Sequence, residues 1–172
     1  MQVVEVKDAE QVKDFLAVNA IMNAANPCYI RALDNEVNEV FDPVKNKNFK
    51  WGQAKRWVAY TDDGLLVGRI AAFTNDKYIN KGTDFKTGGV GFFDCINDQA
   101  TANLIFDTAK EWLFSMGVEA MDGPINFGDR DKWWGLMVDG FDKEPMYGMS
   151  FNPSYYQALF EGYGFKNYYN QY

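Results

Sequence analysis

The stretch from Gly88 to Gly117 decides the expected fold. Residues 88–96 read Gly-Gly-Val-Gly-Phe-Phe-Asp-Cys-Ile, a run typical of a buried strand, and residues 97–99 read Asn-Asp-Gln. An amphipathic pattern follows and ends at Gly117, a residue type favoured just past helix C-termini. A strand that runs directly into a helix presents free backbone N–H groups and the positive end of the helix dipole at one point. The sequence therefore predicts an anion-binding geometry at this junction, with ordinary packing as the alternative.

The residues before this stretch predict a strand, two helices and a hairpin. Asp8 and Gln11 form a capping box, and apolar residues follow at helical spacing. Asp62-Asp63-Gly64 joins two runs rich in β-forming residues, which is a strong hairpin signal. The predicted elements are a strand at 3–6, a helix from residue 8 to the break at 26–27, a helix at 33–41, strands at 56–61 and 65–75, and a polar loop at 76–87.

The residues after this stretch predict a strand at 118–121, an irregular segment at 123–151, a helix from about residue 152 to Gly164, and a final strand from Phe165. The whole order predicts an α/β (α+β) fold in one domain over residues 1–172, with 123–151 as an insertion. We expect a twisted mixed sheet flanked by helices. The fourth and fifth strands should run parallel and splay apart, with the helix Gln99–Met116 crossing between them.

Composition limits the function. The chain has 172 residues, and aromatic residues make up 17% of it, enough to build a sizeable core. Its net charge of −7 disfavours a nucleic-acid partner, which binds a basic surface. It has no histidine, which excludes a Ser-His or Cys-His pair and a His-ligated metal, so no metal site is predicted.

The cellular setting follows from what the sequence lacks. The first residues have neither the basic start nor the apolar run of a signal peptide. No apolar run approaches the ~20 residues that a membrane span needs. The two cysteines, Cys28 and Cys95, are too few for a disulfide framework. We therefore expect a cytoplasmic protein that does not bind membranes.

The order of elements resembles the GNAT superfamily of N-acetyltransferases, as a divergent member. Residues 57–60 and 67–71 look like the second and third strands of that family, and 91–117 look like its fourth strand and cofactor helix. Residues 155–165, Tyr-Tyr-Gln-Ala-Leu-Phe-Glu-Gly-Tyr-Gly-Phe, look like its closing helix and the Gly-Phe that follows. The resemblance covers nearly the whole chain except 123–151.

The resemblance implies a coenzyme A thioester, acetyl-CoA or another acyl-CoA. The family's loop reads Gln/Arg-x-x-Gly-x-Gly/Ala, and its amides hold the pyrophosphate. That pattern falls here on Asn97, Ala100 and Ala102, so the glycines are replaced by alanines and no arginine is present. By this resemblance the pantetheine would run along the end of the fourth strand. The implied cofactor-binding residues are Phe93, Cys95, Ile96, Asn97, Asp98, Gln99, Ala100, Thr101 and Ala102.

The resemblance also implies catalytic positions. The family often places a tyrosine four residues before the Gly of Gly-Phe, where it protonates the departing thiolate. Phe160 stands there in this chain, and Tyr156 lies one helical turn earlier on the same face. A carboxylate is the usual base for the amine, and the implied candidates are Asp94 in the fourth strand and Glu119 or Asp122 in the fifth. Asp94 could equally face water, since strand alternation puts it opposite Phe93.

Residues 126–135 mix glycines, charges and tryptophans, as loops that line binding clefts often do. Arg130, Trp133 and Trp134 are the candidate substrate residues, and the alternative is that both tryptophans cover the sheet.

Two functions remain open at this point. One is an N-acyltransferase that moves an acyl group from a CoA thioester to a small-molecule amine. The other is a catalytically silent GNAT-like domain with a structural or ligand-binding role in a larger protein or dimer. The chain ends soon after Phe165, where the family usually adds one or two strands, so we expect either a fragment of a longer protein or a homodimer partner or second domain that completes the sheet. A transferase that uses aminoacyl-tRNA is a third reading, which the negative charge disfavours.

Overall fold

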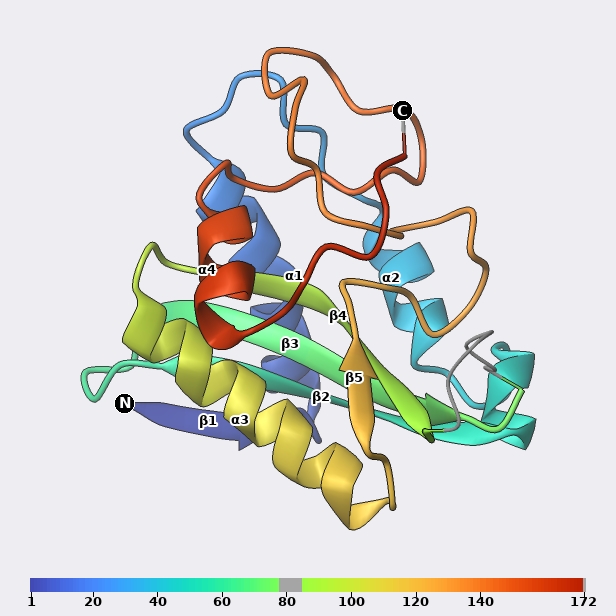
Figure 1. The fold of residues 1–172 in the computed structure, drawn as a ribbon. Coiled ribbons are helices and arrows are strands. Elements are labelled where there is room, and N and C mark those ends of the chain that lie inside the picture. The colour runs from blue at the N-terminus through green and yellow to red at the C-terminus, as the bar shows by residue number, and fades with distance from the viewer. Residues whose placement is uncertain (78–84, 172) are drawn as a thin grey trace.

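A computed structural model describes residues 1–77 and 85–171, and its central feature is a mixed sheet. The sheet has five strands in the order β1-β2-β3-β4-β5 (Figure 1). The strands are β1 Gln2–Glu5, β2 Gly52–Tyr60, β3 Leu66–Asn75, β4 Thr87–Cys95 and β5 Ala120–Asp122. Neighbours pair antiparallel from β1 to β4, and β4 pairs with β5 in parallel. The predicted fold class is therefore confirmed.

Helices cover both faces of this sheet. They are α1 Ala9–Asn23, α2 Asp34–Val40, the 3₁₀ helix η1 Lys47–Lys50, α3 Gln99–Ser115 and α4 Tyr156–Tyr163. Helix α3 crosses one face, with α4 beside it, while α1 and α2 lie on the other (Figure 1). Buried side chains of α3 and α4 form one apolar cluster with the sheet, and those of α1 and α2 form a second.

Local signals in the sequence explain where most elements begin and end. The predicted capping box is present, since the Asp8 side chain accepts from the Gln11 amide and the Gln11 side chain accepts from the Asp8 amide. Gly64 in the β2–β3 hairpin, Gly117 after α3 and Gly164 after α4 all have positive φ, which favours glycine. Within the described residues, 123–151 contain no helix or strand, as predicted. Phe165 and the residues that follow it to 171 form no strand, so that prediction was wrong. Part of the predicted loop at 76–87 lies outside the described residues.

Strand β4 contains a bulge that changes which way its side chains point. Arg69 of β3 pairs with Asp94, but Ala71 pairs with Gly91, so β4 has one extra residue across this step. Phe92 lies within the step and has a φ of 49°. Because side chains alternate along a strand, one extra residue moves all later side chains to the opposite face. Asp94 therefore points towards α1 rather than towards α3.

The parallel pair β4–β5 is short and opens quickly. The strands pair only from Thr87–Ala120 to Gly89–Asp122, and the chain then leaves β5 through the loop that starts at Gly123 (Figure 1). Strand β4 continues to Cys95 without β5 beside it, so the predicted splaying of the two strands is confirmed. The end of β4 is instead covered by α4.

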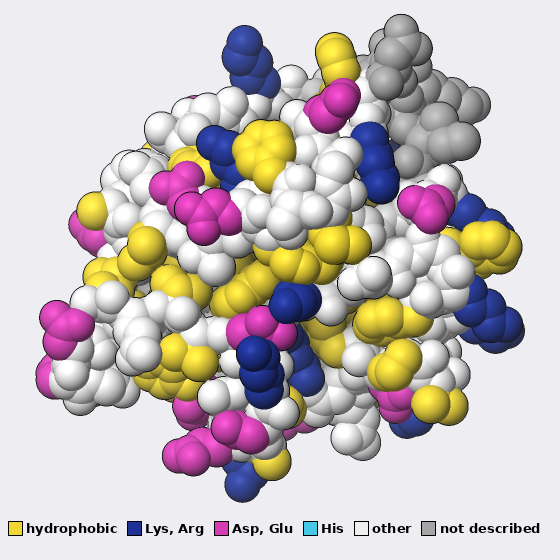
Figure 2. Space-filling view, turned by 90° about the horizontal axis from the view of Figure 1, so that it is seen from below, with side chains coloured by type: hydrophobic (Ala, Val, Ile, Leu, Met, Phe, Trp, Pro, Cys, Tyr) yellow, Lys and Arg dark blue, Asp and Glu magenta, His cyan; other side chains and the backbone are white. Residues whose placement is uncertain are grey.

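Charged side chains of both signs are mixed on the surface. Seen from below, Lys and Arg side chains alternate with Asp and Glu side chains, and hydrophobic side chains lie between them (Figure 2). On this face the negative charge of the chain is therefore not gathered into one patch.

Candidate functional site

The site is built around a buried carboxylate, that of Asp94. Its side chain is 1% exposed. The carboxylate accepts hydrogen bonds from Asn19 Nδ2 at 3.1 Å to each oxygen, from Arg69 Nε at 2.6 Å and from the Tyr156 hydroxyl at 3.0 Å. These donors come from α1, β3 and α4, so the carboxylate joins the layers of the fold. A buried charge is tolerated only with such partners.

Arg69 is buried beside it and is held from two sides. Its Nη1 donates to the Phe15 carbonyl oxygen at 2.8 Å, and its guanidinium lies 4.7 Å from the centre of the Phe15 ring. Burial raises the pKa of Asp94, and the Arg69 charge together with the hydrogen bonds from Asn19, Arg69 and Tyr156 opposes that rise. Since all three partner side chains donate to it, they favour the ionised carboxylate.

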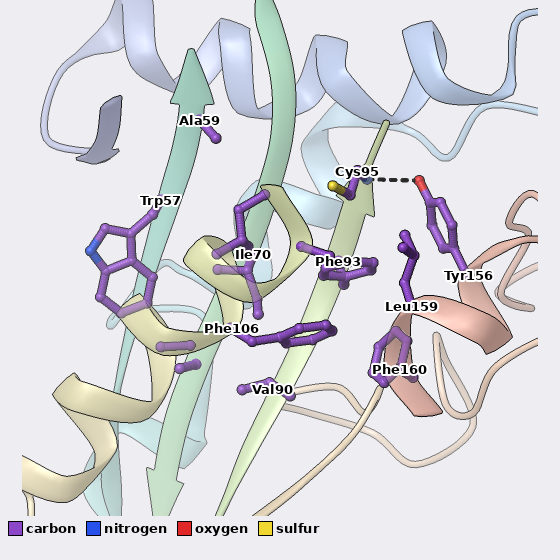
Figure 3. Packing of buried hydrophobic residues seen from close by; sticks show 14 of the residues in the cluster. Trp57, Ala59, Ile70, Val90, Phe93, Cys95, Phe106, Tyr156, Leu159 and Phe160 are labelled. Atoms are coloured by element: carbon purple, nitrogen blue, oxygen red, sulfur yellow. Dashed lines mark hydrogen bonds between the residues drawn. The ribbon is translucent and has the colours of Figure 1, made fainter. Parts of the chain in front are cut away.

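Tyr156 connects the carboxylate to the end of β4. Its hydroxyl donates to Asp94 Oδ1 and accepts from the Cys95 amide at 3.0 Å, as the dashed line in Figure 3 marks. Tyr155 donates to the Cys95 carbonyl oxygen at 2.8 Å. Burial raises the pKa of Tyr156 well above its ordinary value, so its hydroxyl keeps its proton at neutral pH. The two tyrosine hydroxyls thus bond the Cys95 amide and carbonyl groups, which a neighbouring strand would otherwise pair with.

A cavity of about 90 Å³ lies against this polar cluster. Its walls come from β3 and β4, from α1, α2 and the loop between them, from α4 and from the 124–152 segment. Seven of the 22 lining residues are aromatic: Tyr29, Phe92, Phe93, Trp133, Phe151, Tyr156 and Phe160. The charged lining residues form two ion pairs, Arg69 with Asp94 at 2.6 Å and Arg31 with Asp34 at 2.7 Å. The cavity is thus aromatic and has no net charge.

The structure brings some of the sequence-predicted catalytic residues together and not others. Asp94 and Tyr156 are hydrogen-bonded to each other and line the cavity. Glu119 is exposed and lies just before β5, and its amide bonds to the Lys86 carbonyl oxygen next to the first residue of β4. It therefore lies at the opposite end of β4 from Asp94. Phe160 lines the cavity, at the position where the resemblance implies a tyrosine.

Of the three predicted substrate residues, one lines the cavity and two do not. Trp133 lines the cavity, and its ring lies 5.4 Å from that of Phe92. Arg130 lies outside the cavity lining, with its guanidinium 5.1 Å from the Trp134 ring and its Nη2 donating to the Tyr169 hydroxyl at 2.8 Å. Trp134 is also not among the lining residues.

The N-terminus of α3 is exposed, but the carboxylate of Asp98 already caps it. The Asp98 carboxylate accepts from the Thr101 amide at 2.7 Å and from the Thr101 hydroxyl at 2.6 Å. These hydrogen bonds lower the pKa of Asp98. Asn97, Asp98 and Ala100 are exposed. Gln99 is turned towards α4, where its Nε2 donates to the Leu159 carbonyl oxygen.

Aromatic rings fill the space between the end of β4, α3 and α4. Phe93 stacks on Phe106 with ring centres 4.5 Å apart, and Phe160 packs edge-on against both at 5.0 and 4.9 Å (Figure 3). Cys95 is fully buried here, and burial first, then Asp98 and Asp94, raise the pKa of its thiol to about 12. Ile96 is half-buried, and Ala102 and Thr101 are buried in α3. The region in which the resemblance places the pantetheine is closed by side chains.

Three residues of the polar cluster were missed in the sequence: Asn19, Tyr29 and Arg69. Arg69 had a signal, because it is the one charge in the apolar run Val67–Phe73. Asn19 had none, since its partner Asp94 lies 75 residues away in the sequence, and Tyr29 joins the cluster only through Asn19. Among the described residues, no cluster of three acidic or cysteine side chains could hold a metal ion. No helix in the described part of the chain is long and apolar enough to cross a membrane.

Comparison with known proteins identifies the fold. No family model matches the chain. The aminoglycoside 6'-N-acetyltransferase AAC(6')-Ih of Acinetobacter baumannii aligns over 99% of this chain and 94% of its own, with a TM-score of 0.59 and 11% identity. AAC(6')-Iy, solved with a CoA-containing bisubstrate analogue, aligns over 99% of this chain and 94% of its own, with a TM-score of 0.58 and 10% identity. The chain therefore has the GNAT acetyltransferase fold, in a divergent form.

Two curated proteins resemble it more closely in sequence. A bacterial ceramide synthase of Caulobacter vibrioides is 32% identical over 156 residues, which are 90% of this chain and 40% of that protein. The protein YghO of Escherichia coli is 30% identical over 155 residues, which are 90% of this chain and 38% of that protein. The chain thus spans about two fifths of the length of these relatives.

Proposed function

We propose that the protein transfers an acyl group from a CoA thioester to a primary amine. The observation that carries this proposal is the pair of Asp94 and Tyr156, joined by a hydrogen bond at the wall of an aromatic cavity on the bulged strand of a GNAT fold. The neighbours in structure are N-acetyltransferases, one of them solved with a CoA-containing analogue, which supports this class of reaction.

The reaction requires one net proton movement. The amine nitrogen forms a bond to the thioester carbonyl carbon, the C–S bond breaks, and sulfur leaves with the electron pair as a thiolate. The new amide nitrogen loses a proton to solvent, and the thiolate gains one. We assign Tyr156 as the donor of that proton, because it lines the cavity and its raised pKa keeps it protonated; its hydroxyl turns from Asp94 to the sulfur to give the proton. The Cys95 amide, which donates to the same oxygen, holds the phenolate until it recovers a proton from solvent, and the hydroxyl then donates to Asp94 again.

The first turn of α3 fits the pyrophosphate of CoA in place and exposure. Amides in a first turn have no acceptor within the helix, and the exposed Ala100 is small enough to let an anion approach. The exposed Asp98 carboxylate opposes an anion by its charge, so it must turn away from Thr101 when one binds.

The substrates are proposed to be long-chain. One relative is named a ceramide synthase, and a ceramide is a fatty amide of a long-chain amino alcohol. Exposed apolar side chains at the cavity support the same class, since Ile30 and Met149 line it and are 54% and 48% exposed. An alkyl chain that leaves the cavity would meet these side chains. The acyl acceptor would thus present its amine inside and its chain outside.

The second candidate function is a catalytically silent domain. Phe160 stands where a tyrosine would give a proton, and Asp98 and the packed rings occupy the region expected for CoA. This candidate predicts a stable fold that neither binds CoA nor releases thiol.

One experiment separates the two candidates. Free-thiol release would be measured with acetyl-CoA and palmitoyl-CoA across a panel of short and long primary amines, for the wild type, Tyr156→Phe and Phe160→Tyr. We expect turnover by the wild type that falls about 10²-fold or more in Tyr156→Phe and rises in Phe160→Tyr. In parallel, CoA at 100 times its dissociation constant should stabilise the fold by about 2.7 kcal/mol. No thiol release in any variant, together with no thermal shift, would establish the silent domain.

A further inference from the structure

The polar groups of the cavity are almost all engaged, which restricts where an amine can bind. Asp94 Oδ1 accepts from Asn19 and Tyr156, and Oδ2 accepts from Asn19 and Arg69. A carboxylate has about four lone-pair positions. Since its side chain is also 1% exposed, Asp94 has no position left for a substrate N–H.

The neighbours of Asp94 are equally unsuited to receive an amine. Arg69 is a cation that donates to Asp94 and to the Phe15 carbonyl oxygen, so it repels an ammonium group. The Tyr156 hydroxyl donates to Asp94, accepts from the Cys95 amide, and belongs to a side chain that is 1% exposed. Both residues support the cluster from inside.

Tyr29 differs from these residues in exposure and in bonding. It is half-buried, lines the cavity, and its ring lies 5.8 Å from that of Phe151. Its hydroxyl proton is directed to Asn19 Oδ1 at 2.6 Å, and Asn19 is fixed in turn by its bonds to Asp94. Among the described residues no donor to the Tyr29 oxygen is found, so its lone pairs are available to a ligand.

We infer that the Tyr29 hydroxyl oxygen accepts a hydrogen bond from the acceptor amine and thereby fixes the nitrogen inside the cavity. Asn19 and Asp94 act as positioning residues, because they hold the Tyr29 proton away from the ligand. The rings of Phe92 and Trp133, which line the same cavity, favour a cation on their faces. The inference rests on the proposed function for the identity of the ligand as an amine.

The electrostatics of the cavity agree with this role. The charged lining residues cancel in two ion pairs, so an ammonium group finds no net negative charge and depends on local acceptors. Burial first, then the charge of Asp94, raise the pKa of the Tyr29 hydroxyl to about 12. Tyr29 therefore stays protonated at neutral pH and binds the amine without removing its proton.

The test is an equilibrium titration with hexylamine, with hexyl methyl ether as a probe of the same chain that lacks N–H groups. Binding would be followed by calorimetry on the whole protein with and without CoA, for the wild type and for Tyr29→Phe. Tyr60→Phe is the matched control, because Tyr60 also donates one hydrogen bond, to Asp14 at 2.7 Å, and does not line the cavity. The folded state of each variant would be checked by thermal unfolding.

The expected result is specific to one hydroxyl and one ligand. Hexylamine should bind about tenfold or more weakly to Tyr29→Phe, since a hydrogen bond to a charged group is lost, while Tyr60→Phe should match the wild type. Affinity for the ether should not change. Equal hexylamine affinity in Tyr29→Phe, an equal loss for both probes, or no hexylamine binding by the wild type would overturn the inference. Tyr29-dependent binding without thiol release would retain it and refute the acyltransferase proposal.

Discussion

The two faces of strand β4 are buried by different kinds of contact. Towards α1, Asp94 and Arg69 bury opposite charges and need every partner in place. Towards α3, Phe93 is buried among rings and needs only contact area (Figure 3). A polar cluster is costly when one member is lost, whereas a ring cluster loses stability in proportion to the contacts removed. The face towards α1 thus holds the polar groups of the candidate site, and the face towards α3 holds the packed rings that stabilise the fold.

The largest effect should come from breaking the polar face. Asp94→Ala leaves the Arg69 guanidinium buried without its partner and should lower the free energy of unfolding by about 3–5 kcal/mol. Urea unfolding measures this loss. The control is the double variant Asp94→Leu with Arg69→Met, which removes both charges and should regain much of the stability. A loss under about 1 kcal/mol in Asp94→Ala would show that the two faces do not differ as described.

An intermediate effect should come from the ring face. Phe106 is 0% exposed and contacts the rings of Phe93, Phe160, Tyr163 and Phe165. Phe106→Leu should cost about 2 kcal/mol by lost ring contacts and residual space. Phe114→Leu on the same helix is the control, since Phe114 is 54% exposed and its change should stay within about 0.5 kcal/mol. Equal costs at the two positions would contradict the packing of this face.

The smallest effect on stability should come from the N-terminal end of α3, next to the ring face. Asp98→Ala removes the cap on the Thr101 amide and should lower the melting temperature slightly. Because the pKa of Asp98 is lowered in the fold, the stabilisation by its carboxylate is present at neutral pH and disappears as the pH falls through that lowered pKa. The difference between wild type and variant should therefore narrow in acid.

Asp98→Ala also tests whether CoA binds at the first turn of α3. Without the Asp98 charge the first turn of α3 should bind an anion about two- to fivefold more tightly. Titration of CoA into Asp98→Ala and into the wild type measures this change, and Asp107→Ala, further along α3, serves as the control for charge alone. Unchanged CoA affinity in Asp98→Ala would place the pyrophosphate elsewhere.

Local signals made most of the fold predictable. The Asp8 capping box, the hairpin at Gly64 and the helix stops at Gly117 and Gly164 depend on neighbours in sequence, so each could be assigned from a few residues. The final strand from Phe165 could not, because a strand forms only when another strand offers hydrogen bonds. No strand pairs with that segment among the described residues.

The site was less predictable than the fold. Asp94 was chosen from a family position and Tyr156 from its place one helical turn before Phe160, and the direction of Asp94 was left open because alternation alone does not reveal a bulge. Asn19 joins the cluster only through its contact with Asp94, 75 residues away, and Tyr29 joins it only through Asn19. Such contacts leave no periodic pattern in the sequence.

The bulge in β4 changes which residues of the strand face the cavity. Before it, the even-numbered residues Gly88 and Val90 face α3, and after it the odd-numbered residues Phe93 and Cys95 do so. Without the bulge, regular alternation of the same residues after Gly91 would put Asp94 on the α3 face and Phe93 on the α1 face. The carboxylate would then lie among the rings of Phe106 and Phe160, and a ring would face Asn19 and Arg69. The chemical character of this cavity is thus set by how many residues precede Asp94 in its strand as much as by the aspartate itself.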